Sequence, residues 1–437
     1  MKYFFLFITT LCFHTLTAQI TQKQINVFLN DTAVRSGHVG ISIYEPATKK
    51  YLYNYNADKN FTPSSNVKLF TMYAGMKYLG DSLVGLIIFE DSTDIILIPT
   101  GDPTLLHASF SNQPIVKYLQ IKNKRIWATN NNFKSNKYGE GWSWNDYSDY
   151  YMPERTALPI YGNVVLFSGT KNQIQQTPIV AINNLKNDTH SNNGAIGYIS
   201  EVRRSELTNS FSLQIDGSKS TLVEVPFITS DDLAAKLLAD TIYKKIVPAN
   251  NVMPEGLCRN AKKFKIHSQP TDSLLRPMMH NSDNFFAEQT LLMVSNEKLG
   301  YMSDEKIIDT LLKTDFKDLP TKPRWVDGSG LSRYNLFSPK DFIFLLDKMK
   351  NEFGMDRIKN ILPTAGQGTL KGYYENLSGL IYAKTGSMSN NVSLSGFLYT
   401  KKNKMLIFSI QINAYNGTGR AGRRAIEKML QQIRENN

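Results

Sequence analysis

The chain has 437 residues, of which 41% are hydrophobic and 20% are charged, and its formal net charge is +12. This length suffices for two or three domains, and the composition is that of a globular protein and excludes a disordered chain. The basic residues are scattered, so the charge indicates a solubilising surface, with an anionic surface as the alternative partner.

The first eighteen residues have the features of a signal peptide. Lys2 gives a positive start, an apolar run over 3–13 is too short to span a bilayer, and Ala18 offers a small residue for cleavage. Leu16 is larger than the usual residue at its position, which leaves an uncleaved anchor or a buried N-terminal segment as the alternatives. We expect a cleaved, exported chain without nucleic-acid partners. Cys258 would then be its single cysteine, buried and without a disulfide.

The N-terminal part alternates short helices and strands. Residues 22–30 predict a helix, and 38–44 and 50–55 predict two strands joined by a turn at Pro46. Thr62, Pro63 and Ser64 then give a helix start, and apolar spacing continues over 67–78 until Gly80.

The residue pattern changes between residues 81 and 259, where short strand-like runs, at 83–89, 95–98 and 221–225, are separated by polar turns. This predicts an inserted, mostly β region of one or two subdomains. Helical spacing returns over 272–299, and Ser338-Pro339 begins another helix. Strands over 380–384, 393–400 and 404–414 and a helix over 420–434 follow. We therefore expect one antiparallel sheet completed by both ends of the chain, in a domain of residues 19–80 and 260–437.

One serine and lysine pair stands at the predicted helix start. Ser65 and Lys68 are three residues apart, which places both side chains on one helix face. A serine needs a neighbouring base, and a buried lysine kept neutral by desolvation would serve. The same Ser-x-x-Lys pattern recurs at Ser168, Ser295 and Ser303, so any single copy is weak and is explained equally well by a surface pair.

Two further motifs follow. Ser282-Asp283-Asn284 precedes a helical run, where its hydroxyl and amide would relay a proton and hold a carbonyl, although a polar helix cap explains it equally well. Lys384-Thr385-Gly386 ends an apolar strand candidate, where a cation and a hydroxyl would grip a carboxylate and a glycine would admit a peptide close to the strand. Together and in this order, the three motifs are the signature of penicillin-binding proteins and class A β-lactamases.

Ser65 and Ser282 are 217 positions apart, which is more than the spacing between these two motifs in class A β-lactamases. In this long spacing the chain resembles the D-alanyl-D-alanine carboxypeptidase/endopeptidase family, the class C low-molecular-mass penicillin-binding proteins. Further stretches share the likeness: 101–105 (GDPTL), 141–146 (GWSWND), 327–333 (DGSGLSR), 368–370 (GTL) and Ser395-Gly396. The resemblance implies an α+β fold, a transpeptidase-type domain with an antiparallel sheet and helices carrying a large insertion. It also implies periplasmic peptidoglycan peptides as substrates and β-lactams as covalent inhibitors, without a cofactor or metal.

The same resemblance assigns roles to residues. Ser65 would be acylated, with Lys68 as its base, and Ser282 and Asn284 would relay a proton and position the substrate. Lys384 and Thr385 would bind the terminal carboxylate beside Gly386, and the N–H groups of Ser65 and Ser387 would form the oxyanion hole. Asp146 and Arg333 would contact a diaminopimelate side chain, with a turn cap and a surface arginine as the alternatives. Ser387 stands where the family usually has threonine.

Other functions receive less support from the sequence. There is no Gly-x-Ser-x-Gly elbow, and the six histidines show neither zinc spacing nor the arrangement of a Ser-His-Asp hydrolase. A non-catalytic wall-binding or penicillin-sensing protein remains as an alternative, as does a β-lactamase. The choice between carboxypeptidase and endopeptidase, the oligomeric state and contact with a membrane or wall are left open by the sequence.

Overall fold

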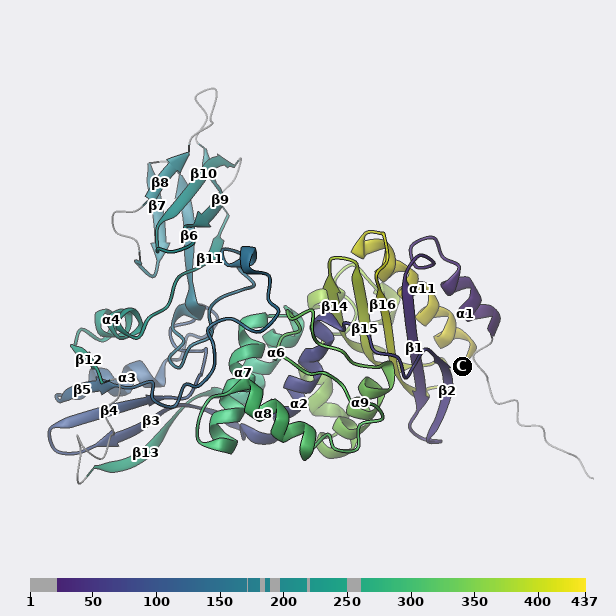
Figure 1. Ribbon diagram of the computed structural model, residues 1–437, viewed down its shortest axis with the longest axis horizontal. Coiled ribbons are helices and arrows are strands. Elements are labelled where there is room, and N and C mark those ends of the chain that lie inside the picture. The colour runs from purple at the N-terminus through teal and green to yellow at the C-terminus, as the bar shows by residue number, and fades with distance from the viewer. Residues whose placement is uncertain (1–21, 171, 181–184, 189–196, 218–220, 250–260) are drawn as a thin grey trace, which may run out of the picture.

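The computed structural model describes residues 22–170, 172–180, 185–188, 197–217, 221–249 and 261–437. The predicted signal peptide over 1–18 and Cys258 lie outside the described residues. In the described part, no helix combines the length and hydropathy that crossing a membrane requires. The described chain forms three sheets and a central group of helices (Figure 1).

The first sheet joins the two ends of the chain. Its strand order is β14 (Ile381–Met388), β15 (Asn391–Tyr399), β16 (Met405–Asn413), β1 (His38–Glu45) and β2 (Lys50–Tyr55), and every pair is antiparallel. His38 pairs with Asn413 and Tyr44 with Ile407, so the first and last strands of the sequence lie side by side. The predicted antiparallel sheet is therefore confirmed.

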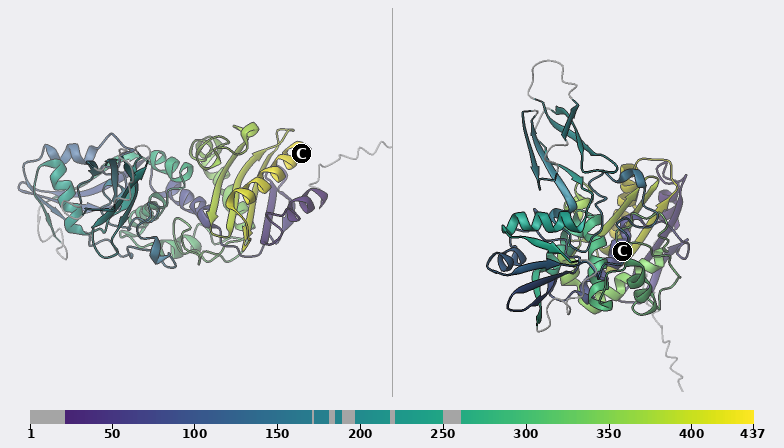
Figure 2. Two further views of the ribbon diagram at one scale, coloured as in Figure 1. Left: turned by 90° about the horizontal axis from the view of Figure 1, so that it is seen from above. Right: turned by 60° about the vertical axis from the view of Figure 1, so that its left-hand side comes forward.

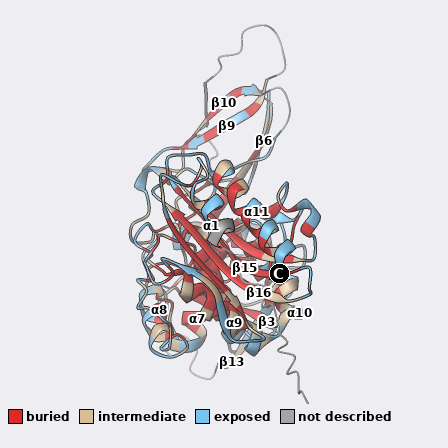
Figure 3. Cartoon of the chain, turned by 90° about the vertical axis from the view of Figure 1, so that its right-hand side faces the viewer, coloured by how far each residue is buried: buried red, intermediate tan, exposed pale blue. Residues whose placement is uncertain are grey.

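Helices cover both faces of this sheet, and its central strands are buried (Figure 3). One face packs against α1 (Gln22–Leu29) and the amphipathic α11 (Gly419–Asn436), which contributes Ile426, Met429, Leu430 and Ile433 to the core. The other face packs against the helical group, to which the strands contribute Phe397 and Ile407. Burial on both faces explains why β15 is an almost continuous apolar and small-residue run.

The helical group consists of α2 (Lys68–Tyr78), α6 (Thr271–His280), α7 (Asn284–Leu299), α8 (Asp304–Lys313), α9 (Pro339–Phe353) and α10 (Met355–Ile361). Helix α2 is buried along nearly its whole length, as its apolar sequence requires. The helical spacing expected over 272–299 is divided between α6 and α7, which residues 281–283 separate. Ser282 has a φ of 58°, which an α-helix cannot contain.

Two more sheets lie on the other side of the helical group (Figures 1 and 2). One has the order β12 (Ile246–Pro248), β5 (Arg125–Ala128), β4 (Asp94–Pro99), β3 (Ser82–Glu90) and β13 (Lys262–Pro270), with α3 (Pro114–Gln120) and α4 (Asp231–Ile242). The other contains β6 (Val164–Thr170), β7 (Gln173–Thr177), β8 (Leu185–Asp188), β9 (Tyr198–Arg204), β10 (Phe211–Gly217) and β11 (Val223–Pro226). Short 3₁₀ turns occur at Ser64–Val67, Trp144–Asp146, Tyr161–Asn163, Gly368–Leu370 and Glu375–Leu377.

The limits of the inserted region depend on strand β13. This strand pairs with β3 over Lys262–Pro270, in the sheet that the expected insertion over 81–259 begins. Because a strand belongs with the sheet that satisfies its backbone, we propose that the insertion ends at Pro270 and contains two subdomains, one for each sheet.

Candidate active site

The first turn after β2 carries Ser65 and Lys68. Ser65 lies in the 3₁₀ turn Ser64–Val67 and is half-buried, and Lys68, which is fully buried, begins α2. The turn has no side-chain cap, in contrast to the capped start expected from the sequence. It is held from outside, since a Cβ at Gly330 would lie 2.0 Å from the Ser64 carbonyl oxygen. The Ser65 hydroxyl is thus partly accessible while the neighbouring amine of Lys68 is shielded from water.

The Lys68 amine has three close partners. Its Nζ lies 3.0 Å from Ser65 Oγ and 2.6 Å from both Asn284 Oδ1 and the Ser329 carbonyl oxygen. Burial lowers the pKa of Lys68 to about 8, against the opposing effect of nearby carboxylates, Asp327 foremost. A lysine with this pKa is neutral often enough at neutral pH to take a proton from Ser65.

The other copies of Ser-x-x-Lys have ordinary structural roles. Ser303 accepts a hydrogen bond from the Lys306 N–H as the N-cap of α8. Ser295 donates its hydroxyl to the Tyr301 carbonyl. Ser168 lies in β6, and the lysine of its motif falls outside the described residues. The structure therefore distinguishes the first copy from the two that can be compared with it.

The Ser-Asp-Asn motif divides its three side chains between two tasks. Asp283 is the N-cap of α7 and accepts from the Phe286 N–H at 2.8 Å, so the helix-cap explanation holds for this residue. Ser282, in the left-handed turn, accepts a hydrogen bond from Lys384 Nζ at 2.9 Å. Asn284 accepts from Lys68 through Oδ1 and donates through Nδ2 to the Tyr151 carbonyl at 3.0 Å. Ser282 and Asn284 thus reach the same site as Ser65.

Strand β14 contributes the residues of the third motif, Lys384-Thr385-Gly386, to the site. Lys384 is fully buried, and its pKa is lowered by burial and then by the positive charges of Lys68 and Arg423. Thr385 Oγ1 donates to Thr369 Oγ1 at 2.8 Å, which ties the strand to the Gly368–Leu370 turn. Lys384 and Thr385 thus place an amine and a hydroxyl on β14, with the positive charge of Arg423 nearby, which suits an anionic group.

Gly386 and Ser387 come next on β14, and Gly386 lies against the residues that lead into the Ser64–Val67 turn. A Cβ at Gly386 would lie 2.2 Å from Ser393 Oγ and 2.6 Å from the Pro63 carbonyl oxygen, so no side chain fits. Ser387 is exposed, and its hydroxyl donates to the Gly386 carbonyl and accepts from Arg423 Nη2 at 2.7 Å. The serine that replaces the usual threonine is therefore bonded to an arginine of α11.

Asp146 and Arg333 lie on two segments that the structure packs together. A Cβ at Gly141 would lie 2.7 Å from the Tyr334 ring, and Trp142 Nε1 donates to Asp327 at 2.9 Å. Asp146 is half-buried. The pKa of Tyr151 is raised by burial first, then by the Asp149 carboxylate, and to a smaller extent by the Asp146 carboxylate. Arg333 is exposed. No direct bond between Asp146 and Arg333 is present in the described part of the chain, and their roles stay predictions.

Several supporting residues were missed by sequence reasoning. Asp327 holds the 327–333 loop by accepting from the N–H groups of Gly330 and Ser332 at 2.8 and 2.6 Å. Glu288 accepts from the Ser329 N–H at 2.7 Å and is buried. Its position four residues after Asn284, on the same helix face, is a signal that could have identified it.

Comparisons with known proteins identify the family and the fold of the chain. Residues 21–436 match the model of the D-Ala-D-Ala carboxypeptidase 3 (S13) family. The chain is 25% identical to a D-alanyl-D-alanine carboxypeptidase of Actinomadura sp. (strain R39), over 92% of this chain and 82% of that protein. Its fold resembles penicillin-binding protein 4 of Haemophilus influenzae, with a TM-score of 0.74, 19% identity and coverage of 94% and 98%. A predatory peptidoglycan endopeptidase of Bdellovibrio bacteriovorus matches with a TM-score of 0.54 and 13% identity, over 91% and 92% of the chains.

Proposed function

Because the chain belongs to the D-Ala-D-Ala carboxypeptidase 3 (S13) family, we propose that Ser65 is the nucleophile with which this serine D,D-peptidase cleaves peptidoglycan peptides. The expected α+β fold of the penicillin-binding proteins is confirmed, as is the expected class of hydrolase. The observation that carries the assignment of Ser65 is its contact with a buried lysine of lowered pKa, at 3.0 Å.

Acylation begins with Lys68 as the neutral amine. Its lone pair accepts the Ser65 hydroxyl proton while Oγ attacks the carbonyl carbon before the terminal D-alanine. The oxyanion that forms is stabilised by the backbone N–H groups of Ser65 and Ser387. Collapse of the intermediate breaks the C–N bond. The proton that Lys68 took from Ser65 passes by way of Ser282 to the departing amine, which leaves as D-alanine, and Lys68 is again neutral.

Deacylation repeats these steps with water. Lys68 accepts a proton from a water molecule, whose oxygen attacks the ester carbonyl, and the C–O bond to Ser65 breaks as the proton returns to Oγ. A β-lactam is attacked in the same way. Its leaving nitrogen stays attached to the acyl group when the ring opens, so it continues to occupy the site and hinders water.

The substrate carboxylate binds at the edge of β14. Lys384 and Thr385 provide a cation and a hydroxyl, and Arg423 adds positive charge beside them. Because burial and like charges disfavour protonation of Lys384 in the free enzyme, binding of an anion raises its pKa and takes up a proton. Strand β14 is the outer strand of its sheet, so an extended peptide can pair with its outer edge.

The side chain of a diaminopimelate residue lies between Asp146 and Arg333 in this proposal. The carboxylate would bind its amine and the guanidinium its carboxylate, which are charge-assisted contacts. The same site accepts a terminal D-alanine or a cross-linked peptide, so carboxypeptidase and endopeptidase reactions follow one mechanism. The substrate location implies export to the periplasm, by the signal peptide proposed over residues 1–18.

The test is digestion of purified muropeptides by the wild type and Ser65→Ala, with products identified by mass. We expect loss of D-alanine or of cross-links with the wild type, and no change with the variant. A fluorescent penicillin should label only the wild type. Labelling that persists in Ser65→Ala would refute the assignment. Rapid turnover of a chromogenic cephalosporin without stable label would indicate a β-lactamase, and binding without turnover would indicate a penicillin sensor.

A further inference from the structure

Two hydrogen-bond acceptors determine where the lone pair of Lys68 points. A neutral amine has two N–H donors, and the two acceptors at 2.6 Å are Asn284 Oδ1 and the Ser329 carbonyl oxygen. When both are engaged, the lone pair is directed at the third neighbour, Ser65 Oγ at 3.0 Å. Displacing either acceptor would turn the lone pair away from the hydroxyl proton that it must accept.

Both acceptors are anchored by a short segment of the inserted region. The Asn284 amide is fixed by donation to the Tyr151 carbonyl at 3.0 Å. The Ser329 peptide is fixed by donation of its N–H to Glu288 Oε1 at 2.7 Å, and Glu288 Oε2 accepts from Arg155 Nη1 at 3.2 Å. Tyr151 and Arg155 are only four residues apart in the sequence, so one stretch of the insertion anchors both contacts.

Arg155 is held firmly for a residue so far from the catalytic motifs. Its side chain is 1% exposed, and its guanidinium also donates to Asp304 at 2.6 Å and to the Asn136 carbonyl at 3.0 Å. It lies 5.4 Å from the Trp142 ring, whose indole N–H binds Asp327. Such multiple, directed contacts fix a guanidinium in one orientation.

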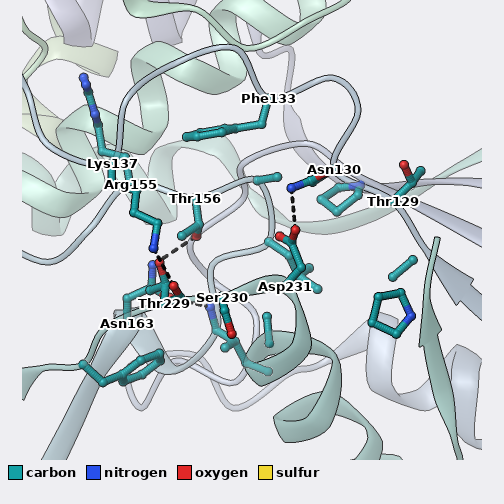
Figure 4. A pocket seen from close by; sticks show the side chains of 18 residues that line it. Thr129, Asn130, Phe133, Lys137, Arg155, Thr156, Asn163, Thr229, Ser230 and Asp231 are labelled. Atoms are coloured by element: carbon teal, nitrogen blue, oxygen red, sulfur yellow. Dashed lines mark hydrogen bonds between the residues drawn. The ribbon is translucent and has the colours of Figure 1, made fainter. Parts of the chain in front are cut away.

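The arginine also lines a cavity within the inserted region. The cavity has a volume of about 310 Å³ and is lined by residues of both inserted subdomains (Figure 4). Arg155 thus separates this space from the buried carboxylate of Glu288. A methionine at position 155 would preserve most of the aliphatic volume while removing the charge.

The pair is electrostatically linked to the catalytic lysine. Burial and then the Asp327 carboxylate raise the pKa of Glu288 to about 7, with a smaller contribution from Asp304, whereas Arg155 opposes the rise and favours the ionised carboxylate. The Glu288 carboxylate in turn favours the charged form of Lys68, as do Asp327 and Asp283. The lysine faces a further cation, Lys384, whose protonation it disfavours.

We propose that Arg155 is a positioning residue for Lys68, acting through Glu288 and the Ser329 peptide. The inference rests on the proposed function, because it assumes that Lys68 is the base of Ser65. It gives the inserted region a part in catalysis, since the guanidinium crosses from the insertion to α7. The competing explanation is an ion pair that only joins the two parts of the structure.

The test measures acylation by a fluorescent penicillin across pH, together with thermal unfolding, in Arg155→Met, Arg155→Lys, Glu288→Gln and Arg155→Met/Glu288→Gln. Arg204→Met is the matched control, because Arg204 is another buried arginine of the insertion whose guanidinium donates to the Pro226 and Ser205 carbonyls. We expect Arg155→Met to slow acylation by about tenfold to a hundredfold, the usual effect of a misplaced reacting group. Arg155→Lys should recover part of this loss.

The pH profile separates positioning from folding. The pKa of Glu288 is about 7 in the wild type, and loss of the Arg155 charge raises it further, so the ionisation of this carboxyl group moves to higher pH in the profile of Arg155→Met. The double variant lacks this carboxyl group, so the shifted ionisation should disappear and acylation should partly recover. Arg204→Met should unfold at a lower temperature with an unchanged profile.

Three results would overturn the inference: a wild-type rate and profile in folded Arg155→Met, a loss that the second substitution does not relieve, or an unchanged profile in Glu288→Gln. If Arg155→Met does not fold, Glu288→Gln decides, because removing that carboxylate lowers the pKa of Lys68 and must move the acidic limb to lower pH. Absence of acylation in the wild type would contradict the proposed function instead.

Discussion

Replacing Lys68 by arginine tests whether a neutral amine activates Ser65. Arginine retains the positive charge and can still donate hydrogen bonds, but it does not lose its proton in a protein. We therefore expect Lys68→Arg to lose acylation at every pH, because it offers Ser65 no lone pair. The wild type, by contrast, should become faster as the pH rises.

The magnitude follows from the pKa of Lys68, which burial lowers from 10.5 to about 8. At pH 7 about one side chain in ten is then neutral, against about one in three thousand for an ordinary lysine. The shift corresponds to about 3 kcal/mol. Lys68 is protonated below its pKa, so the acylation rate should fall about tenfold for each pH unit below 8 and level off above it.

The assay is the first-order rate of labelling at saturating fluorescent penicillin, which separates acylation from the binding of the anion at Lys384. Lys306→Arg is the matched control, since Lys306 belongs to another Ser-x-x-Lys pair and its ammonium contacts the exposed Glu305. This variant should retain the wild-type rate and profile. Measurable labelling by Lys68→Arg, or a wild-type rate independent of pH between 5 and 8, would refute the role of Lys68 as base.

Two further predictions concern the surroundings of Ser65. Gly330→Ala should lose acylation and about 3 kcal/mol of stability in denaturant unfolding, because the φ of Gly330 is 85° and the new Cβ would collide with the Ser64 carbonyl. The control Gly300→Ala, with a φ of 82° and no atom within 4 Å of the new Cβ, should cost about 1 kcal/mol of stability and leave acylation intact. Equal losses in the two variants would contradict the packing argument. Asp146→Asn and Arg333→Met should each slow cleavage of diaminopimelate peptides about tenfold, as measured by product mass, and slow penicillin labelling much less. Equal slowing of both reactions would argue against selective recognition of that side chain.

Much of the fold could be predicted because its signals are local. Strands β1 and β16 are apolar runs at the two ends of the chain, and their pairing follows from the need to complete one sheet. The sequence indicates that residues 282–284 precede a helical run, which is α7, but it does not show the left-handed turn that ends α6. The backbone of Ser282 takes this conformation where its hydroxyl meets Lys384, a contact that only the tertiary structure reveals.

The site was predictable where a motif carries the chemistry and unpredictable where a tertiary contact does. Ser65, Lys68 and Ser282 are recognised from the order and spacing of short motifs. Arg155 belongs to no such pattern, and its contact with Glu288 joins positions 133 apart in the sequence. A buried arginine and a buried glutamate cannot be recognised as partners from either local sequence, because each alone looks like a surface residue.

The surroundings of Lys68 combine two opposing requirements. Three carboxylates, of Asp327, Glu288 and Asp283, favour its charged form, while its burial favours the neutral form and outweighs them. Catalysis needs both influences, because the lysine must release its proton before the reaction and accept one during it. By pairing with Glu288, Arg155 offsets part of the negative charge near the lysine while holding the Ser329 carbonyl in place. An arginine from the insertion can therefore adjust both the direction of the lone pair and the pKa of the amine that carries it.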